Sequence, residues 1–180
     1  MIGEIVFRVT KRIVDNDDDR VKEFNINRFL IIGVMAVIAM TLYFKYDIKT
    51  IIAYGGVGVF LISIGIIDYY TRYVYLKMAI LGIIYAFIFG LNIYGIKYII
   101  YILTISIFII ILAYFTGKWY GDIEAALIVA LTLGIDGLAI TFFVVGLISI
   151  VVALFKRKLH CIVPVCPMIA IGYLVSILLL

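Results

Sequence analysis

Seven apolar segments, divided by short polar or glycine-containing joints, occupy most of the sequence after residue 28. A helix rises about 1.5 Å per residue, so about 20 mostly apolar residues cross the roughly 30 Å of bilayer hydrocarbon. The segments comprise residues 29–44, 50–67, 76–92, 96–115, 123–135, 138–155 and 161–180. Hydrophobic residues make up 67% of the chain and charged residues 14%, against about half and about a quarter in soluble domains. The sequence therefore predicts an all-α membrane protein, a polytopic bundle of about seven transmembrane helices.

The joint Gly134-Ile-Asp-Gly137 decides between seven spans and six, because the fifth segment is short. Two glycines and an aspartate suit a tight turn. With a turn there and the N-terminus inside, twelve Lys and Arg residues lie on the inner side and three on the outer side. A continuous helix would make this nine against six. The positive-inside rule favours the first arrangement.

The first 28 residues carry scattered charges and lack the apolar core of a signal peptide. Ile2, Ile5, Val6, Val9 and Ile13 fall at helical spacing on one face, with charged residues between them. This pattern predicts an amphipathic helix that lies on the membrane surface, and a solvated tail is the alternative that it leaves open.

The net charge of +4 is distributed between apolar segments, so no nucleic-acid partner is expected. The two cysteines, Cys161 and Cys166, are compatible with packing residues, a disulfide or half of a metal site. The chain has one histidine, so it offers few of the nitrogen ligands that zinc sites use. We therefore expect packing residues, and neither a metal nor a cofactor.

Two acids stand at the edges of apolar segments. Beyond residue 28 the acids are Asp47, Asp68, Asp122, Glu124 and Asp136. Asp68 ends the second segment and Asp122 opens the fifth, positions where ionisable groups are costly and usually functional. The chain crosses the membrane twice between them, so both carboxylates are expected at the same, cytoplasmic, leaflet.

Two carboxylates a few ångströms apart cannot both ionise easily, and such a pair shares one proton. The ionised member can then take a proton from water while the protonated member hydrogen-bonds a scissile carbonyl. Purely structural roles are the alternative for each acid. Asp122 would cap a helix or interact with its dipole, and Asp68 would pair with Arg72 four residues later.

Three stretches resemble the type IV prepilin peptidases, intramembrane aspartic peptidases of the GxGD class. Gly121-Asp122 opens a span, and Ile67-Asp68 is followed by a short stretch that contains Arg72. Val163-Pro-Val-Cys-Pro-Met-Ile-Ala-Ile-Gly172 is similar to the closing Pro-Phe-Gly-Pro stretch of the family. The order of anchors and spans fits the family from about residue 50 to residue 180.

The chain departs from the family pattern at three positions. Trp119 replaces the first glycine of GxGD, Glu124 replaces a frequent lysine, and Cys166 stands where the closing stretch has glycine. The chain also lacks the two Cys-x-x-Cys pairs of the larger bacterial members, and in this it resembles the shorter archaeal members.

The resemblance implies an aspartic endopeptidase that removes the short charged leader from pilin-like or archaellin precursors at the cytoplasmic face of the cell membrane. It assigns Asp68 and Asp122 as the catalytic pair and leaves open which is the base. Gly121, Glu124 and Arg72 are expected to contact substrate.

The implied organisation has three parts. Residues 1–28 form a cytoplasmic head, residues 29–49 an extra N-terminal span and loop, and residues 50–180 a six-span peptidase-like membrane domain. Two other functions stay open on the sequence: a small transporter or proton pathway, and a catalytically inactive scaffold.

Overall fold

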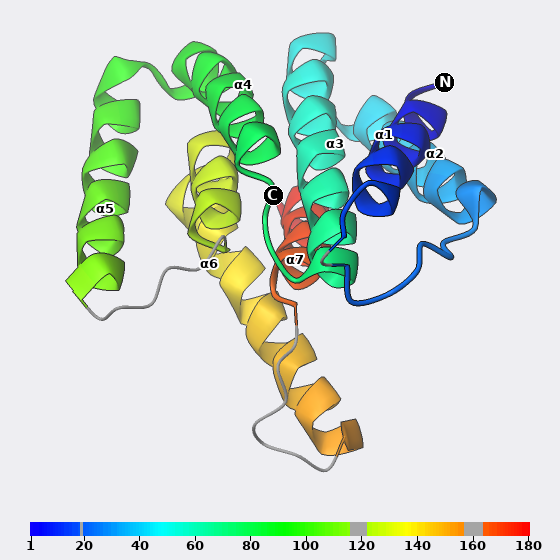
Figure 1. Ribbon diagram of the computed structural model, residues 1–180. Coiled ribbons are helices and arrows are strands. Elements are labelled where there is room, and N and C mark those ends of the chain that lie inside the picture. Colours follow the sequence, from blue (N-terminus) through cyan, green and yellow to red (C-terminus); the bar gives the residue numbers. More distant parts are fainter. Residues whose placement is uncertain (19, 116–121, 157–163) are drawn as a thin grey trace.

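The computed structural model describes residues 1–18, 20–115, 122–156 and 164–180, and in those ranges it consists of helices joined by loops, without strands (Figure 1). The helices are α1 (Ile2–Asp15), α2 (Arg28–Lys45), α3 (Ile48–Thr71), α4 (Leu76–Tyr94), α5 (Ile96–Phe115), α6 (Asp122–Lys156) and α7 (Cys166–Leu179). Within the described ranges, four helices are long and apolar enough to cross a membrane: α2, α3, α4 and α6. The predicted all-α fold is confirmed for the described residues, and the four long apolar helices are consistent with a membrane protein. The count of seven spans stays a prediction.

The core lies where α7 packs against α3 and α6. Tyr173 on α7 is fully buried, and its hydroxyl donates to the backbone carbonyl of Tyr54 on α3 (2.8 Å). The hydroxyl groups of Ser176 on α7 and Thr141 on α6 lie 2.9 Å apart, and each also bonds a carbonyl in its own helix. Small residues and hydroxyl pairs of this kind hold helices together where no water competes.

Helix α6 is interrupted at Gly134, which adopts φ 74° and ψ −168°. The hydroxyl of Tyr98, on α5, occupies the place that a Cβ at residue 134 would need. The same hydroxyl accepts a hydrogen bond from the backbone N–H of Ile135 (2.8 Å). The predicted interruption near residues 134–137 is therefore present, and it lies at the first glycine.

The chain reverses direction at this interruption. Asp122 and Phe142 line the same cavity, although 20 residues of continuous helix would separate them by about 30 Å. The start of α7 contacts both arms of α6, since Cys166 bonds Asp122 and the Ser149 hydroxyl donates to the Met168 sulfur. The last turns of α6, orange in Figure 1, extend beyond the rest of the bundle.

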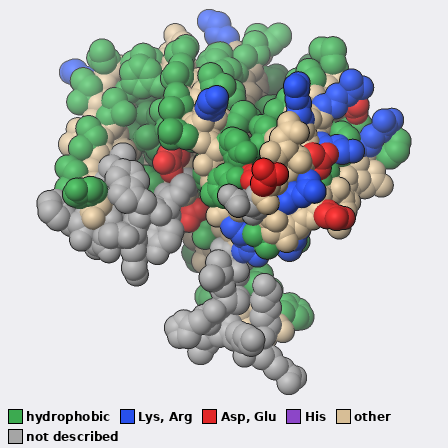
Figure 2. Space-filling model, viewed as in Figure 1, with side chains coloured by type: hydrophobic (Ala, Val, Ile, Leu, Met, Phe, Trp, Pro, Cys, Tyr) green, Lys and Arg blue, Asp and Glu red, His purple; other side chains and the backbone are tan. Residues whose placement is uncertain are grey.

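The N-terminal helix α1 packs against α2 and α3. Its buried face consists of Gly3, Val6, Thr10 and Val14. Of the residues on the predicted apolar face, Val6 is buried against the bundle, whereas Ile2, Ile5 and Val9 are exposed, and their contact with a membrane surface stays a prediction. The buried face also includes glycine and threonine, which an apolar pattern omits. Gly3 lies against the backbone of Ile32 on α2, and the buried Thr10 hydroxyl donates to the Val6 carbonyl within α1. Lys and Arg side chains gather on the α1 side of the molecule (Figure 2).

The segment after α1 is fastened to the turn between α3 and α4. The Asp17 carboxylate accepts hydrogen bonds from the hydroxyls of Tyr73 and Tyr75. The hydrogen bond to Asp17 raises the pKa of the Tyr73 phenol above its ordinary value. The Val21 N–H donates to the Tyr70 carbonyl (2.8 Å), and the Tyr70 hydroxyl donates to Asn25 (2.7 Å). The N-terminal residues thus hold the end of α3 in place.

Replacing Gly134 by alanine should destabilise the protein by about 1–3 kcal/mol, the cost of a non-glycine residue in this backbone region. The added Cβ would also displace Tyr98. Gly146→Ala on the same helix is the matched control, because a Cβ there meets nothing within 4 Å. Thermal unfolding in detergent measures both variants. Equal stability of the two variants would show that the interruption does not depend on glycine.

Candidate functional site

Asp68 lies in the last turn of α3, inside the helix rather than at its end. The helix stops at Arg72, a non-glycine residue with φ 66°, whose N–H donates to the Asp68 carbonyl (2.9 Å). A left-handed residue that bonds back four positions is a common helix terminator, usually glycine. The backbone of Asp68 therefore closes the helix, and its carboxylate, on a residue only 7% exposed, is free to face a neighbouring helix.

Asp122 is the first residue of α6, and Glu124 also lies in the first turn. Carboxylates at this end of a helix face its unpaired N–H groups and the positive end of its dipole. Asp122 is half-buried. The predicted substrate residue Gly121, and Trp119, lie outside the described residues.

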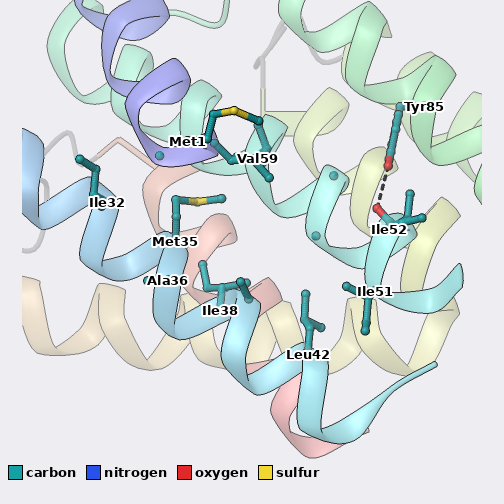
Figure 3. Close-up of a pocket in the computed structure, with 15 residues that line it drawn as sticks. Met1, Ile32, Met35, Ala36, Ile38, Leu42, Ile51, Ile52, Val59 and Tyr85 are labelled. Carbon is teal, nitrogen blue, oxygen red and sulfur yellow. Dashed lines mark hydrogen bonds between the residues drawn. The ribbon is translucent and has the colours of Figure 1, made fainter. Parts of the chain in front are cut away.

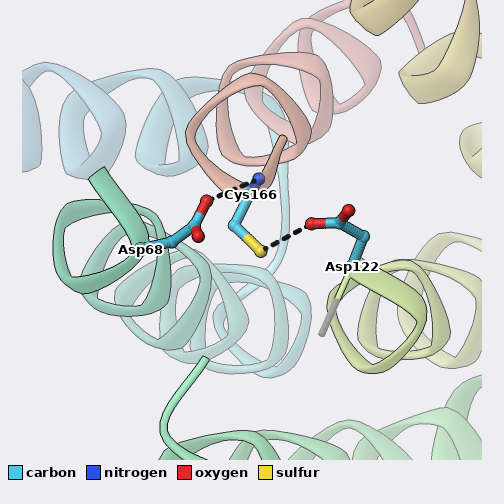
Figure 4. Close-up of side chains that lie close together, drawn as sticks. All are labelled: Asp68, Asp122 and Cys166. Atoms are coloured by element: carbon cyan, nitrogen blue, oxygen red, sulfur yellow. Dashed lines mark hydrogen bonds between the residues drawn. The ribbon is translucent and has the colours of Figure 1, made fainter. Parts of the chain in front are cut away.

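Cys166 opens α7 between these two acids (Figure 4). Its backbone N–H, which has no partner within α7, donates to Oδ2 of Asp68 (3.3 Å). Its thiol donates to Oδ1 of Asp122 (3.3 Å). One residue of α7 therefore bridges the end of α3 and the start of α6.

Gly65 lets the start of α7 come this close to α3. A Cβ at residue 65 would lie 3.0 Å from Cα of Pro167 and 3.3 Å from the Cys166 carbonyl oxygen. Both neighbours are backbone atoms, which cannot rotate away. Pro167 sits in the first turn of α7, where a residue without an N–H is tolerated.

The three side chains form one cluster. A carboxylate oxygen of Asp68, a carboxylate oxygen of Asp122 and Sγ of Cys166 all lie within 4.8 Å of one another. Among the described residues this is the one group of three metal-type donors. The structure thus brings together the two acids that the sequence singled out, while their catalytic role stays a prediction.

The other residues expected to contact substrate surround this cluster. Arg72 is exposed and acts electrostatically on Asp68, as does Asp122. Glu124 lies near enough to Cys166 to act on it electrostatically. Its Oε2 atom is buried and has no hydrogen-bond partner among the described residues.

The polar contacts of Cys166 are what the sequence did not predict. Cys166 is buried, as expected of a packing residue, with 1% of its surface exposed. Its bridging position follows from its place at the start of a helix, next to a proline, and from the register of α7 against α3 and α6. Cys161 lies outside the described residues.

Of two cavities in the bundle, one is lined by an acid of the cluster and the other is not. Asp122 lines a cavity of about 210 Å³ between α5 and the two arms of α6, whose other lining residues are apolar except Ser106. A cavity of about 610 Å³ lies between α1, α2 and α3, where Met1, Met35 and Val59 line it (Figure 3). None of the acids of the cluster lines this second cavity.

Comparison with protein-family models, curated proteins and solved structures finds no match for this chain. The resemblance to the prepilin peptidases therefore rests on the quoted residues.

Enlarging Gly65 to alanine should loosen the contact between α3 and α7 and expose the Cys166 thiol. Overpacking by a methyl group costs about 1–3 kcal/mol, so alkylation of Cys166 should accelerate about fivefold or more where it proceeds by local opening. Mass spectrometry after N-ethylmaleimide treatment, in a Cys161→Ser background, measures the rate.

Gly58→Ala on the same helix is the control, since a Cβ there meets Tyr173 at an ordinary 3.7 Å. If both variants react at the wild-type rate, the close approach at Gly65 does not protect the thiol.

Proposed function

We propose that this chain is an intramembrane aspartic endopeptidase of the type IV prepilin peptidase kind. The observation that supports it is the meeting of Asp68 and Asp122, which lie 54 residues apart in the sequence and within 4.8 Å through their carboxylate oxygens. Two carboxylates this close do not both ionise easily, and a pair that holds one proton is the working state of aspartic peptidases.

In the proposed reaction, the ionised carboxylate takes a proton from a water molecule as that water adds to the peptide carbonyl carbon. The protonated carboxylate hydrogen-bonds the carbonyl oxygen and stabilises the charge that develops there. Collapse of the tetrahedral species breaks the C–N bond, and the leaving nitrogen receives the proton taken from water. The roles of Asp68 and Asp122 are interchangeable in this scheme.

The proposed substrates are pilin-like or archaellin precursors, each with a short charged leader before an apolar helix. We place the site at the cytoplasmic face of the cell membrane and give the chain seven spans, with a six-span core from residue 50 and one extra span before it. Exposed Arg72 at the end of α3 is positioned to meet an acidic group of a leader. Glu124 has a buried Oε2, so we assign it to the site itself rather than to the leader.

Replacing either acid by asparagine should abolish cleavage of a precursor. Loss of a positioned acid or base costs about 10²–10⁴-fold in rate. The assay co-expresses a panel of pilin-like and archaellin precursors with wild type, Asp68→Asn or Asp122→Asn, and detects shortening by immunoblot. Asp47→Asn is the matched control, because Asp47 caps the opposite end of α3 and asparagine caps equally well.

Retained cleavage in both variants would rule out the aspartic mechanism. A wild type that shortens no precursor would instead support the transporter or scaffold alternatives, with Trp119 in place of the GxGD glycine as the first suspect.

A reporter fused after Leu180 should lie outside the cell, because seven spans with the N-terminus inside end on the outer face. The reversal of α6 at Gly134 supports this count. A six-span chain would end inside. A fusion at Tyr73, in the turn between α3 and α4, should lie inside under either count and serves as the control. Paired periplasm-active and cytoplasm-active reporters measure both positions.

A further inference from the structure

The cluster of Asp68, Asp122 and Cys166 has the composition of a metal site. Its donors come from three different helices, α3, α6 and α7, and lie within 4.8 Å of one another. In a tetrahedral zinc site, with bonds of about 2.0–2.3 Å, neighbouring donors lie about 3.3–3.8 Å apart. Closing the cluster onto an ion therefore requires shifts of about 1 Å, which side-chain rotation can supply.

The donor types select the kind of ion. A thiolate favours soft or borderline cations, whereas Mg²⁺ and Ca²⁺ need six or more oxygen ligands. Three protein ligands leave a fourth position for water, as in open zinc sites. We expected no metal because the chain has one histidine, but these three donors include no histidine.

Glu124 provides a second, independent observation. Its Oε2 is buried without a hydrogen-bond partner among the described residues, and its charge acts on Cys166. A buried carboxylate oxygen without a donor is costly. A cation held by Cys166 would supply the positive charge that this oxygen lacks.

We propose that Asp68, Asp122 and Cys166 bind a thiophilic divalent cation of the Zn²⁺ class. Binding releases the thiol proton and any proton on the two carboxylates. The occupied site has no shared proton left for hydrolysis, so the cation inhibits cleavage; this consequence, unlike the binding itself, rests on the proposed function.

The first experiment titrates the purified full-length chain in detergent with Co²⁺, a coloured substitute for Zn²⁺. We expect one Co²⁺ per chain, a sulfur-to-cobalt charge-transfer absorption in the near ultraviolet, and displacement by Zn²⁺. Cys166→Ser should lose the absorption, and Cys161→Ser, which removes the other cysteine, should keep it. Asp68→Asn and Asp122→Asn should keep the absorption but bind Co²⁺ at least about tenfold more weakly, since even outer-shell partners contribute about 10–100-fold.

The proposal is overturned if wild type shows no charge-transfer absorption, or if Cys166→Ser retains it. It is also overturned if neither asparagine variant weakens Co²⁺ binding. The asparagine variants keep the thiol, so they test the site even if Cys166→Ser fails to fold, which its thermal unfolding would reveal.

A cleavage assay separates this inference from the proposed function. Where wild type cleaves a precursor, Zn²⁺ should stop the reaction and a chelator should restore it. Cobalt binding without cleavage of any precursor contradicts the peptidase and supports the metal site. Cleavage that persists with excess Zn²⁺, in a protein that binds no Co²⁺, contradicts the metal site and supports the peptidase.

Discussion

The first N–H groups of a helix have no partner within that helix, and in an apolar bundle they must find acceptors elsewhere. At the start of α7 the acceptor for Cys166 is the Asp68 carboxylate, on α3. That bond needs α7 to approach α3 closely, which Gly65 permits, and it sets the register of α7. The same register places the thiol of Cys166 against Asp122, so the geometry of the whole site depends on this one helix start.

Most of the fold follows from local sequence signals. Apolar length predicts the helices, and the glycines at 134 and 137 predict the break in α6. Counting membrane crossings predicts only that Asp68 and Asp122 lie at the same leaflet. That their carboxylates come within 4.8 Å depends on how α3, α6 and α7 pack. The contacts of Cys166 and the buried face of α1 depend on how helices fit together. An apolar pattern cannot tell whether a neighbouring helix, lipid or water covers a face, and it overlooks Gly3 and Thr10.

The proposed peptidase and the proposed metal site share two side chains, the carboxylates of Asp68 and Asp122. A pair of carboxylates that shares a proton has a place for a positive charge, which a proton or a larger cation can occupy. Cys166, where the resembling family has glycine, adds a donor that only the larger cation can use. In these two proposals, Cys166 gives the acid pair a second occupant without altering the pair itself.

The reversal of α6 at Gly134 makes its two arms unequal. The 13 residues from Asp122 to Gly134 rise about 20 Å, roughly 10 Å less than the thickness of bilayer hydrocarbon. In the proposed seven-span arrangement, with Gly134 at one membrane surface, Asp122 would stop short of the other. A bilayer accommodates such a short helix by thinning or by admitting water beside it. In the seven-span arrangement that we propose, this short arm would thin the bilayer locally. Water and the polar part of a substrate would then reach carboxylates that a full thickness of hydrocarbon would separate from them.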